Sequence, residues 1–355
     1  MIASRVTSFA ARCAAAERIR ALKESVAEAV TDEFFRRHPD LLARYGEVGR
    51  KRGIEDACYH LDFLAAAVES GSVAAFCEYA RWCRRLLGPM GLGPHLLAEN
   101  LVQIGNSLAE KLGASAAAES IAAFTQGAVQ ACLETPGESL TAAGSLLSDA
   151  RAVFVQTLLV GRRREALVIA RQALREGHAT TDVYTHLFQD GLYDIGRRWE
   201  RGEITVAQEH MATATVQYVI AQIYSELPLA VHSRGRAVVT GVAGEFHQVG
   251  ANIVADMLEA DGWNVRFLGT NMPHRGIVAA VGDGEIDLLG ISATMLFNLP
   301  HVRALVLEVR EKLGARAPRI VVGGSAFRLC DSFCAELGVE GPAADLRAAV
   351  QLCAA

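Results

Sequence analysis

The stretch RAVVTGVAGEFHQVGANIVADMLEADGW, residues 236–263, decides the fold of the C-terminal third of the chain. It begins with an apolar run, turns at a segment that glycine begins and ends (Gly244 to Gly250), and continues with helical periodicity. This order indicates a buried parallel strand followed by a crossover helix. His247 lies in the turn, where open α/β sheets hold small molecules. A lone histidine is also common at protein surfaces, so the rest of the sequence has to distinguish these two readings.

Three further apolar runs repeat the pattern downstream. Together the four runs are RAVVTGVA (236–243), WNVRFLGT (263–270), IDLLGISAT (286–294) and PRIVVGG (318–324). Strands of this kind, alternating with helices, predict a Rossmann-like, doubly wound parallel sheet over residues 234–355. The turns that follow the strands, GEFHQVG, GTNMPH, SATM and GGSAF, are then expected to converge on one edge of the sheet.

The residues before this domain have helical periodicity almost throughout. Residues 1–140 predict an all-helical unit of five or six helices, and residues 145–230 predict an antiparallel four-helix bundle. The stretch TPGESLTAAGS (135–145) between them has the composition of a linker. The fold class is therefore a multidomain α and α/β protein.

Composition excludes several classes of protein. An apolar fraction of 51% and a charged fraction of 21% are typical of a soluble globular chain, and the formal net charge of −5 speaks against direct nucleic-acid binding. None of the eight cysteines forms a CxxC pair, so free thiols in a reducing cytoplasm are expected rather than disulfides or a metal site. We find no signal peptide and no membrane-spanning run, and we expect a cytoplasmic protein.

The turn after the first strand carries a family resemblance. Glu245-Phe246-His247-Gln248-Val249-Gly250 resembles the DxHxxG signature of cobalamin-binding domains, with Glu in place of Asp. The signature continues there with SxL and GG at later strand ends, and this chain has Ser292-Ala293-Thr294 and Gly323-Gly324. The resemblance implies that His247 replaces the vitamin's own base as the lower axial ligand of cobalt, and that the displaced nucleotide tail enters a slot beside the sheet.

Each of these residues has an expected role. Glu245 can accept the remote N–H of His247 and so fix its tautomer. Gly250 is expected to let the next helix pack closely, while Gly323 and Gly324 remove side chains where the tail approaches the backbone. Ser292 is expected to donate to the buried base. Thr294 departs from the family's leucine.

The bundle carries a second resemblance. Nine residues separate Trp199 from Glu209-His210, a Wx9EH arrangement similar to the cap of light-sensing cobalamin proteins, which include regulators that hold adenosylcobalamin in the dark. There the tryptophan shields the adenosyl group, the Glu-His pair lines the same pocket, and Val206 matches another lining position. The alternative is that Trp199 is bundle core and Glu209-His210 an ordinary helix start. Glu200 stands where the regulators have a histidine that ligates cobalt after photolysis, so His210 and water both remain candidates for that position.

The N-terminal helices have a looser resemblance to photocobilins, photoreceptors that pair B12 with biliverdin. Cationic and aromatic side chains gather in one part of the sequence: His60, Tyr79, Trp82, Arg84, Arg85 and His95. They are candidate partners for noncovalently bound biliverdin. The alternative is that the aromatics are core and the arginines are solvated.

These resemblances predict a photoreceptor rather than an enzyme, because the chain has no barrel-length βα repeat and no visible substrate domain. Adenosylcobalamin would bind in the base-off/His-on mode, in which His247 replaces the vitamin's own base on cobalt. Light would then break the cobalt–carbon bond. The bundle would then repack and change a homo-oligomer or the binding of a downstream protein partner. The alternative function is a corrinoid carrier that works with a separate methyltransferase.

Overall fold

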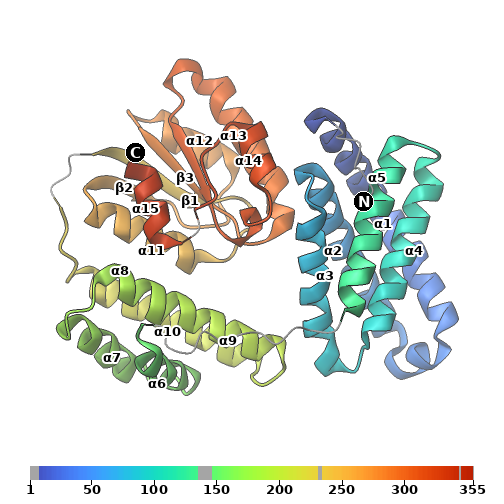
Figure 1. Cartoon of the computed structure of the whole chain (residues 1–355), viewed down its shortest axis with the longest axis horizontal. Helices are drawn as coiled ribbons and strands as arrows, with labels where there is room; N and C mark the ends of the chain where they lie inside the picture. The colour runs from blue at the N-terminus through green and yellow to red at the C-terminus, as the bar shows by residue number, and fades with distance from the viewer. Residues whose placement is uncertain (1–7, 135–145, 231–233, 344, 355) are drawn as a thin grey trace. The chain divides into compact units, whose positions relative to one another are not determined.

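The computed structural model describes residues 8–134, 146–230, 234–343 and 345–354 (Figure 1). The predicted linker, residues 135–145, lies outside the described residues. The chain forms two compact units. Unit 1 holds the N-terminal helices up to Thr135 together with two short segments, Met295–Pro300 and Leu329–Glu336. Unit 2 holds the bundle and the rest of the α/β domain.

Unit 1 is built on five long helices, which agrees with the five or six that the sequence predicts. They are α1 (Phe9–Arg37), α2 (Pro39–Ser70), α3 (Val73–Leu87), α4 (Pro94–Leu112) and α5 (Ala116–Leu133), with a short η1 (Gly88–Met90) between α3 and α4. Helix α2 begins directly at Pro39, because proline is well suited to the first helical position. It kinks at Gly46 and ends at Gly71, which adopts the left-handed conformation.

The bundle in unit 2 follows the four helical segments of the sequence. It comprises α6 (Ser148–Leu159), α7 (Arg163–Arg175), a composite third helix and α10 (Val206–Tyr224). The third helix consists of α8 (Thr180–Asp182), a π-helical turn η2 (Val183–Gln189) and α9 (Asp190–Glu200). Phe154, Phe188 and Val216 are fully buried between these helices and form their core.

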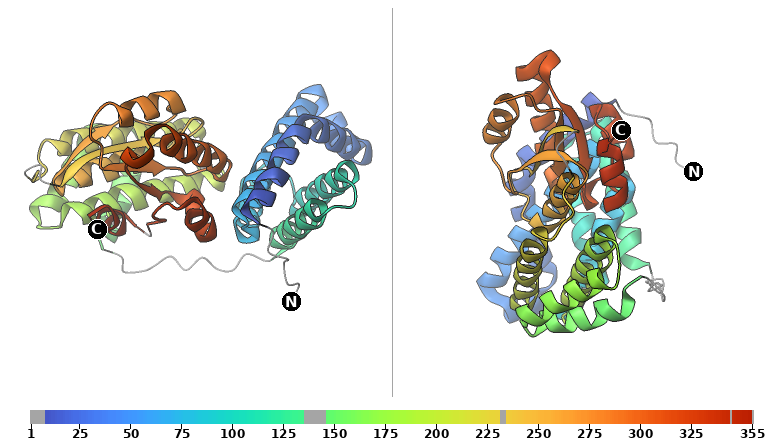
Figure 2. Two further views of the ribbon diagram at one scale, coloured as in Figure 1. Left: turned by 90° about the horizontal axis from the view of Figure 1, so that it is seen from above. Right: turned by 90° about the vertical axis from the view of Figure 1, so that its left-hand side faces the viewer.

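The α/β domain contains a four-stranded parallel sheet in the order β2-β1-β3-β4 (Figures 1 and 2). The strands are β1 (Gly235–Gly241), β2 (Trp263–Phe267), β3 (Leu288–Ser292) and β4 (Arg319–Gly323). The last three lie within predicted apolar runs, and β1 begins one residue before its run. Gly241 pairs with Ser292, and Ser292 pairs with Gly323, so three strands end level with one another. The predicted doubly wound sheet is therefore confirmed.

Helices cover both faces of the sheet. The segments between and after the strands form α11 (Gln248–Ala260), α12 (His274–Gly282), α13 (Leu299–Leu313), α14 (Asp331–Leu337) and α15 (Leu346–Ala354), with short turns η3 (Leu296–Asn298), η4 (Gly314–Arg316) and η5 (Ser325–Phe327). Of these, η3 and nearly all of α14 belong to unit 1. Helices α11 and α15 pack on one face, where Ala251, Leu258 and Cys353 meet Val239 of β1. Helices α12 and α13 lie on the other face (Figure 1).

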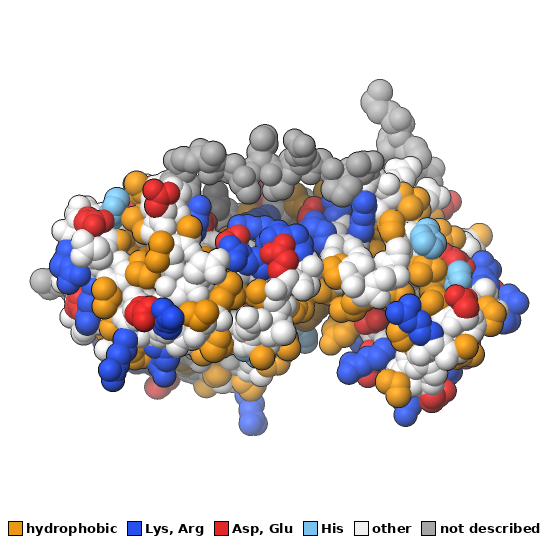
Figure 3. All heavy atoms as spheres, turned by 90° about the horizontal axis from the view of Figure 1, so that it is seen from below, with side chains coloured by type: hydrophobic (Ala, Val, Ile, Leu, Met, Phe, Trp, Pro, Cys, Tyr) orange, Lys and Arg blue, Asp and Glu red, His pale blue; other side chains and the backbone are white. Residues whose placement is uncertain are grey.

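The surface carries charges of both signs. On the face drawn in Figure 3, basic side chains lie beside acidic ones. In the bundle, Arg171 of α7 pairs with Glu226, which follows α10. Within the described ranges, no helix combines the length and the apolarity that crossing a membrane would require.

Candidate functional site

The turns at the carboxyl edge of the sheet are joined to one another by hydrogen bonds. The Gly244 amide donates to Asn271 Oδ1 (2.9 Å), and the Thr294 amide donates to Glu245 Oε2 (2.6 Å). The Ser325 hydroxyl in turn donates to the Thr294 carbonyl (2.9 Å). The four turns that the sequence places at strand ends therefore form one continuous surface.

Glu245 and His247 form the chemical centre of this surface. The Glu245 side chain is fully buried, whereas that of His247 is 54% exposed. One carboxylate oxygen, Oε1, lies 2.5 Å from His247 Nδ1 and also accepts the His247 amide at 2.9 Å. Nδ1 therefore carries the proton, and Nε2, which has no hydrogen-bond partner among the described residues, keeps its lone pair. A neutral imidazole fixed in this way is a good ligand for a metal.

The charge of Glu245 follows from its hydrogen bonds. Burial favours the neutral acid and is the largest single influence on this carboxyl. The hydrogen bonds from the His247 ring, the Thr294 amide and the His247 amide act in the opposite direction and together lower the pKa of Glu245 to about 2. The carboxylate is consequently ionised at neutral pH and holds the His247 ring in one orientation.

Two glycines of the motif leave open space, Gly250 in the first turn of α11 and Gly323 at the end of β4. A Cβ atom built on Gly250 or on Gly323 would meet no atom within 4 Å. The expected role of Gly250 in close helix packing is therefore wrong, because nothing packs against it. Open space at these two positions of the carboxyl edge, which also carries a histidine with a free Nε2, fits a large flat cofactor whose tail passes the sheet edge.

Gly324 has a different reason to be glycine. Its φ is +103°, and a Cβ there would lie 2.2 Å from the Ala293 carbonyl oxygen. Its lack of a side chain thus allows two backbone segments of the protein itself to approach each other, while its expected role beside a nucleotide tail stays a prediction.

The remaining residues of the motif differ in exposure. The Phe246 ring is 75% exposed and Gln248 is also exposed, so both are available to a ligand. Val249 instead turns inward and joins the core shared with the bundle, which corrects its assignment to the binding surface. Ser292 and Thr294 are half-buried at the end of β3.

The bundle residues of the Wx9EH arrangement lie on either side of one turn. Trp199 is half-buried in the last turn of α9. Helix α10 begins with a capping box in which Thr205 and Gln208 exchange hydrogen bonds. In its first turns Glu209 Oε2 lies 2.5 Å from His210 Nδ1, and the His210 side chain is 75% exposed. Val206 is 55% exposed. The part of the chain that the structure describes shows no hydrogen bond or ring contact between Trp199 and the Glu209–His210 pair.

A contact that the sequence did not predict ties the bundle to the carboxyl edge. Arg328, which follows η5, donates to the Tyr193 hydroxyl (3.3 Å), and its guanidinium lies 5.9 Å from the Tyr193 ring centroid. Tyr193 belongs to α9, the helix that ends beside Trp199. The helix that carries Trp199 is thereby anchored close to Gly323 and Gly324. The only sequence signal was the position of Arg328 directly after the turn GGSAF.

In unit 1, three of the candidate bilin residues come together. His60 Nδ1 lies 2.7 Å from the Tyr79 hydroxyl, and burial lowers the pKa of His60 to about 4. Phe63 stacks on Tyr79 with ring centroids 3.7 Å apart, and Trp82 lies 6.0 Å from Tyr79. His60 and Tyr79 thus satisfy each other's polar atoms inside an aromatic cluster.

The other three candidates are engaged elsewhere or exposed. Arg84 donates to the Cys132 carbonyl (3.1 Å) at the end of α5, and Arg85 pairs with Glu78 (3.4 Å). His95 is exposed at the start of α4. The structure therefore brings His60, Tyr79 and Trp82 together, while Arg84, Arg85 and His95 stay predicted partners of a bilin.

Comparisons with known proteins agree with the fold and the motif. Residues 235–351 match a family model described as B12 binding domain, and residues 151–224 match a second model with the same description. Dimethylamine corrinoid protein 3 of Methanosarcina acetivorans is 25% identical over 48% of this chain and 81% of its own length. The HTH-type transcriptional repressor CarH of Myxococcus xanthus is 30% identical over 42% of this chain and 48% of its own length.

A solved structure shares the architecture. The monomethylamine corrinoid protein of Methanosarcina barkeri superposes with a TM-score of 0.52 at 21% identity, and the match covers 58% of this chain and 98% of that one. At this identity the likeness concerns the fold alone. The two family models show cobalamin-binding domains, a helical cap followed by a Rossmann-like domain, and the sequence matches show a distant relationship to corrinoid proteins and to CarH.

Proposed function

We propose that His247 ligates the cobalt of a cobalamin from below in place of the vitamin's own base, and that the chain serves as a corrinoid carrier. The observation that carries the first part is the Glu245–His247 pair, whose buried carboxylate holds Nδ1 and leaves Nε2 free at an exposed position. The open space at Gly250 and Gly323 supports the placement of the ring and its tail. A bound cobalamin would supply a cobalt–carbon bond, which would break either when a methyl group is transferred to an acceptor or when the cofactor absorbs light.

The carrier role is favoured by the relatives. The corrinoid protein of Methanosarcina acetivorans matches over four fifths of its length, whereas the repressor CarH matches over about half. In this role His247 holds the cofactor, the bundle covers it, and a separate methyltransferase supplies the chemistry. The relatives named above are carriers and a regulator, which agrees with a chain that is not an enzyme by itself.

A light sensor is the second candidate, and the Trp199 and Glu209–His210 arrangement favours it. Trp199 would cover a bulky adenosyl group, and His210, oriented by Glu209, would line the same space. In this role adenosylcobalamin is the cofactor, and light changes a homo-oligomer or the binding of a downstream partner. Biliverdin as a second chromophore rests on the resemblance of unit 1 alone. Red absorbance of protein produced with biliverdin would support it.

The lower ligand is tested by electron paramagnetic resonance of the reduced, cob(II)alamin-loaded protein. Protein labelled with nitrogen-15 histidine and loaded with unlabelled cobalamin should show a doublet in place of the nitrogen-14 triplet. His247→Ala should lose this signal, whereas the control His178→Ala should keep it. A triplet that persists in the labelled protein would show that the vitamin's own base is still bound, and the proposal would fail.

The two roles are separated by Trp199→Ala. A sensor loaded with adenosylcobalamin should change its mass in solution on illumination, and the variant should lose this response. A carrier should show no change of mass in light, should bind methylcobalamin equally well with and without Trp199, and should accept a methyl group from its methyltransferase.

A further inference from the structure

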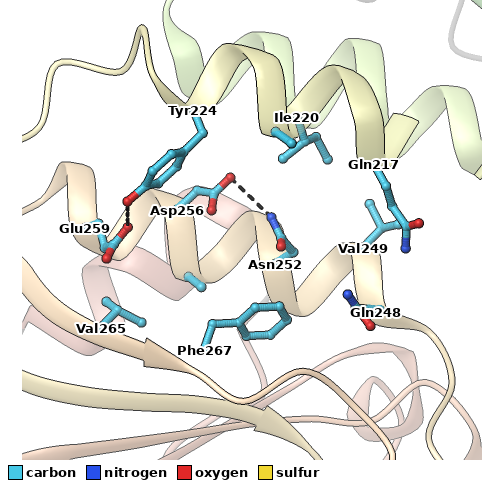
Figure 4. A pocket seen from close by; sticks show the side chains of 12 residues that line it. Gln217, Ile220, Tyr224, Gln248, Val249, Asn252, Asp256, Glu259, Val265 and Phe267 are labelled. Carbon is cyan, nitrogen blue, oxygen red and sulfur yellow. Dashed lines mark hydrogen bonds between the residues drawn. The ribbon is translucent and has the colours of Figure 1, made fainter. Parts of the chain in front are cut away.

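A cavity of about 480 Å³ lies between the bundle and the edge strand of the sheet (Figure 4). Helix α10 forms one wall, α11 forms the second, and β2 closes it from below (Figure 4). Of the motif residues, Gln248 and Val249 reach its wall, whereas Gly250, Ser292 and Gly323 do not. The cavity follows α11 away from the carboxyl edge and is therefore distinct from the surface around His247.

The lining of this cavity is acidic at one end and apolar on one side. Asp256 and Glu259 of α11 contribute carboxyl groups, and Val265 and Phe267 of β2 contribute an apolar wall (Figure 4). Neither Lys nor Arg is among its lining residues. A cation is the charge that such a cavity would stabilise.

Of the two carboxyl groups that line the cavity, that of Asp256 is the more buried. Asp256 is 8% exposed, and the Tyr184 hydroxyl and Asn252 Nδ2 both donate to its Oδ2 at 3.2 Å. Among the described residues, Oδ1 therefore has no hydrogen-bond donor. A buried carboxylate without a cation or a full set of donors is costly, and a ligand with N–H groups would remove that cost.

We propose that this cavity binds a small organic cation, whose ammonium group donates to Asp256 Oδ1 and whose apolar body lies against Phe267 and Val265. Glu259 supplies the second negative charge, and its carboxylate is held by the Tyr224 hydroxyl. The proposal is argued from Asp256, Glu259 and the β2 side chains, and it does not depend on the cobalamin proposal. Because Tyr184 belongs to the π-helical turn of the bundle, an occupant would contact groups fixed by both the bundle and the α/β domain.

The acidity of Asp256 supports this assignment. Burial raises its pKa to about 7, with Glu259 adding to the rise and the Tyr184 hydrogen bond opposing it. Tyr184, Tyr224 and Glu259 are the titratable groups that face it from η2, α10 and α11. A bound cation favours the carboxylate, so binding should release a proton near neutral pH and weaken as the pH falls below about 7.

Calorimetry on the full chain tests the proposal with three probes of similar shape: phenethylammonium, the neutral 2-phenylethanol and the anion 3-phenylpropionate. The ammonium probe should bind saturably and at least about tenfold more tightly than either of the others. Asp256→Asn should weaken its binding about tenfold, and Glu259→Gln should weaken it less. The matched control Glu311→Gln, an exposed acid on α13, should leave binding unchanged.

Circular dichroism and thermal unfolding establish that each variant is folded. Equal binding of the neutral probe, no saturable binding of the ammonium probe, or unchanged binding by folded Asp256→Asn would overturn the proposal. A further outcome is that the chain self-associates without binding the cation, and loses this self-association when residues that line the cavity are substituted. That result would assign the cavity to a second copy of the chain and would also overturn the proposal. None of these outcomes depends on His247, so the cobalamin proposal stands or falls separately.

Discussion

At the scale of single residues, Glu245 explains how the turn holds a histidine in one orientation. Its two oxygens reach two different turns, because Oε1 accepts from His247 and Oε2 accepts from the Thr294 amide. The carboxylate therefore joins the end of β1 to the end of β3 while it fixes the tautomer of His247. Both effects require the ionised form.

Glu245→Gln should lower the free energy of unfolding by about 2 kcal/mol at neutral pH, because a buried charge-assisted network becomes neutral. The hydrogen bonds to Glu245 hold its pKa at about 2 in the folded protein, below the ordinary value of 4.5 for a glutamate. The stabilisation is therefore complete above pH 4.5 and is lost as the pH falls toward 2. Urea titrations of the wild-type protein and the variant at several pH values measure this.

The difference between the two proteins should shrink as the pH falls through that window. Glu311→Gln, on the exposed side of α13, is the control and should behave as wild type at every pH. If the difference in the free energy of unfolding stayed constant down to pH 2, the charge of Glu245 would not contribute to stability.

The sequence could predict this pair but not the cavity beside it. Glu245 and His247 are two residues apart in one turn, so their contact is local and follows from the motif. Asp256, Tyr184 and Tyr224 come from three helices, and only the packing of the bundle on α11 brings them together. The partner of Arg84 could not be predicted for a related reason, since it lies at the end of α5 and is distant in sequence.

At the scale of elements, α11 joins the functional turn to the core. Its first turn leaves Gly250 exposed, while Val249 and Ile253 point into the core shared with the bundle. The strands and the bundle helices were predictable because continuous apolar runs and 3.6-residue periodicity are local signals. The π-helical turn at residues 183–189 was not, because one widened turn leaves the apolar pattern of a helix almost unchanged.

Gly250→Ala should stabilise the cofactor-free protein by about 0.5 kcal/mol, because alanine is the better helix former and the new methyl group meets no atom. The same methyl group should weaken cobalamin binding, since it fills open space at the carboxyl edge that carries His247. Thermal unfolding without cofactor and spectrophotometric titration with hydroxocobalamin measure the two effects.

Gly324→Ala is the matched contrast. Its methyl group would meet the Ala293 carbonyl oxygen, and its φ is +103°, so it should destabilise the cofactor-free protein by about 3 kcal/mol. If Gly250→Ala destabilised the protein as much as Gly324→Ala does, the conclusion that the space around Gly250 is open would be wrong.

At the scale of the whole molecule, the bundle and the α/β domain of unit 2 share one hydrophobic core. Val249, Ile253 and Met257 of α11 belong to the same buried cluster as Val216 and Ile220 of α10. Two regions with a common core lose most of their stability when either one unfolds. Unit 2 is therefore expected to unfold as a single cooperative body, although its two parts match two different family models.

The tryptophans offer a direct measurement, because Trp199 lies in the bundle and Trp263 in the α/β domain. In a Trp82→Phe background, adding Trp263→Phe or Trp199→Phe leaves one reporter for each part. Their urea transitions should coincide.

Ile253→Ala, at a side chain 2% exposed, should move both midpoints together and lower the free energy of unfolding by about 3 kcal/mol, whereas Leu307→Ala on the exposed side of α13 should move neither. Two separate transitions, or a shift seen by Trp263 alone, would mean that the bundle is held only loosely, and that the cavity between α10 and α11 has no fixed walls with which to select a ligand.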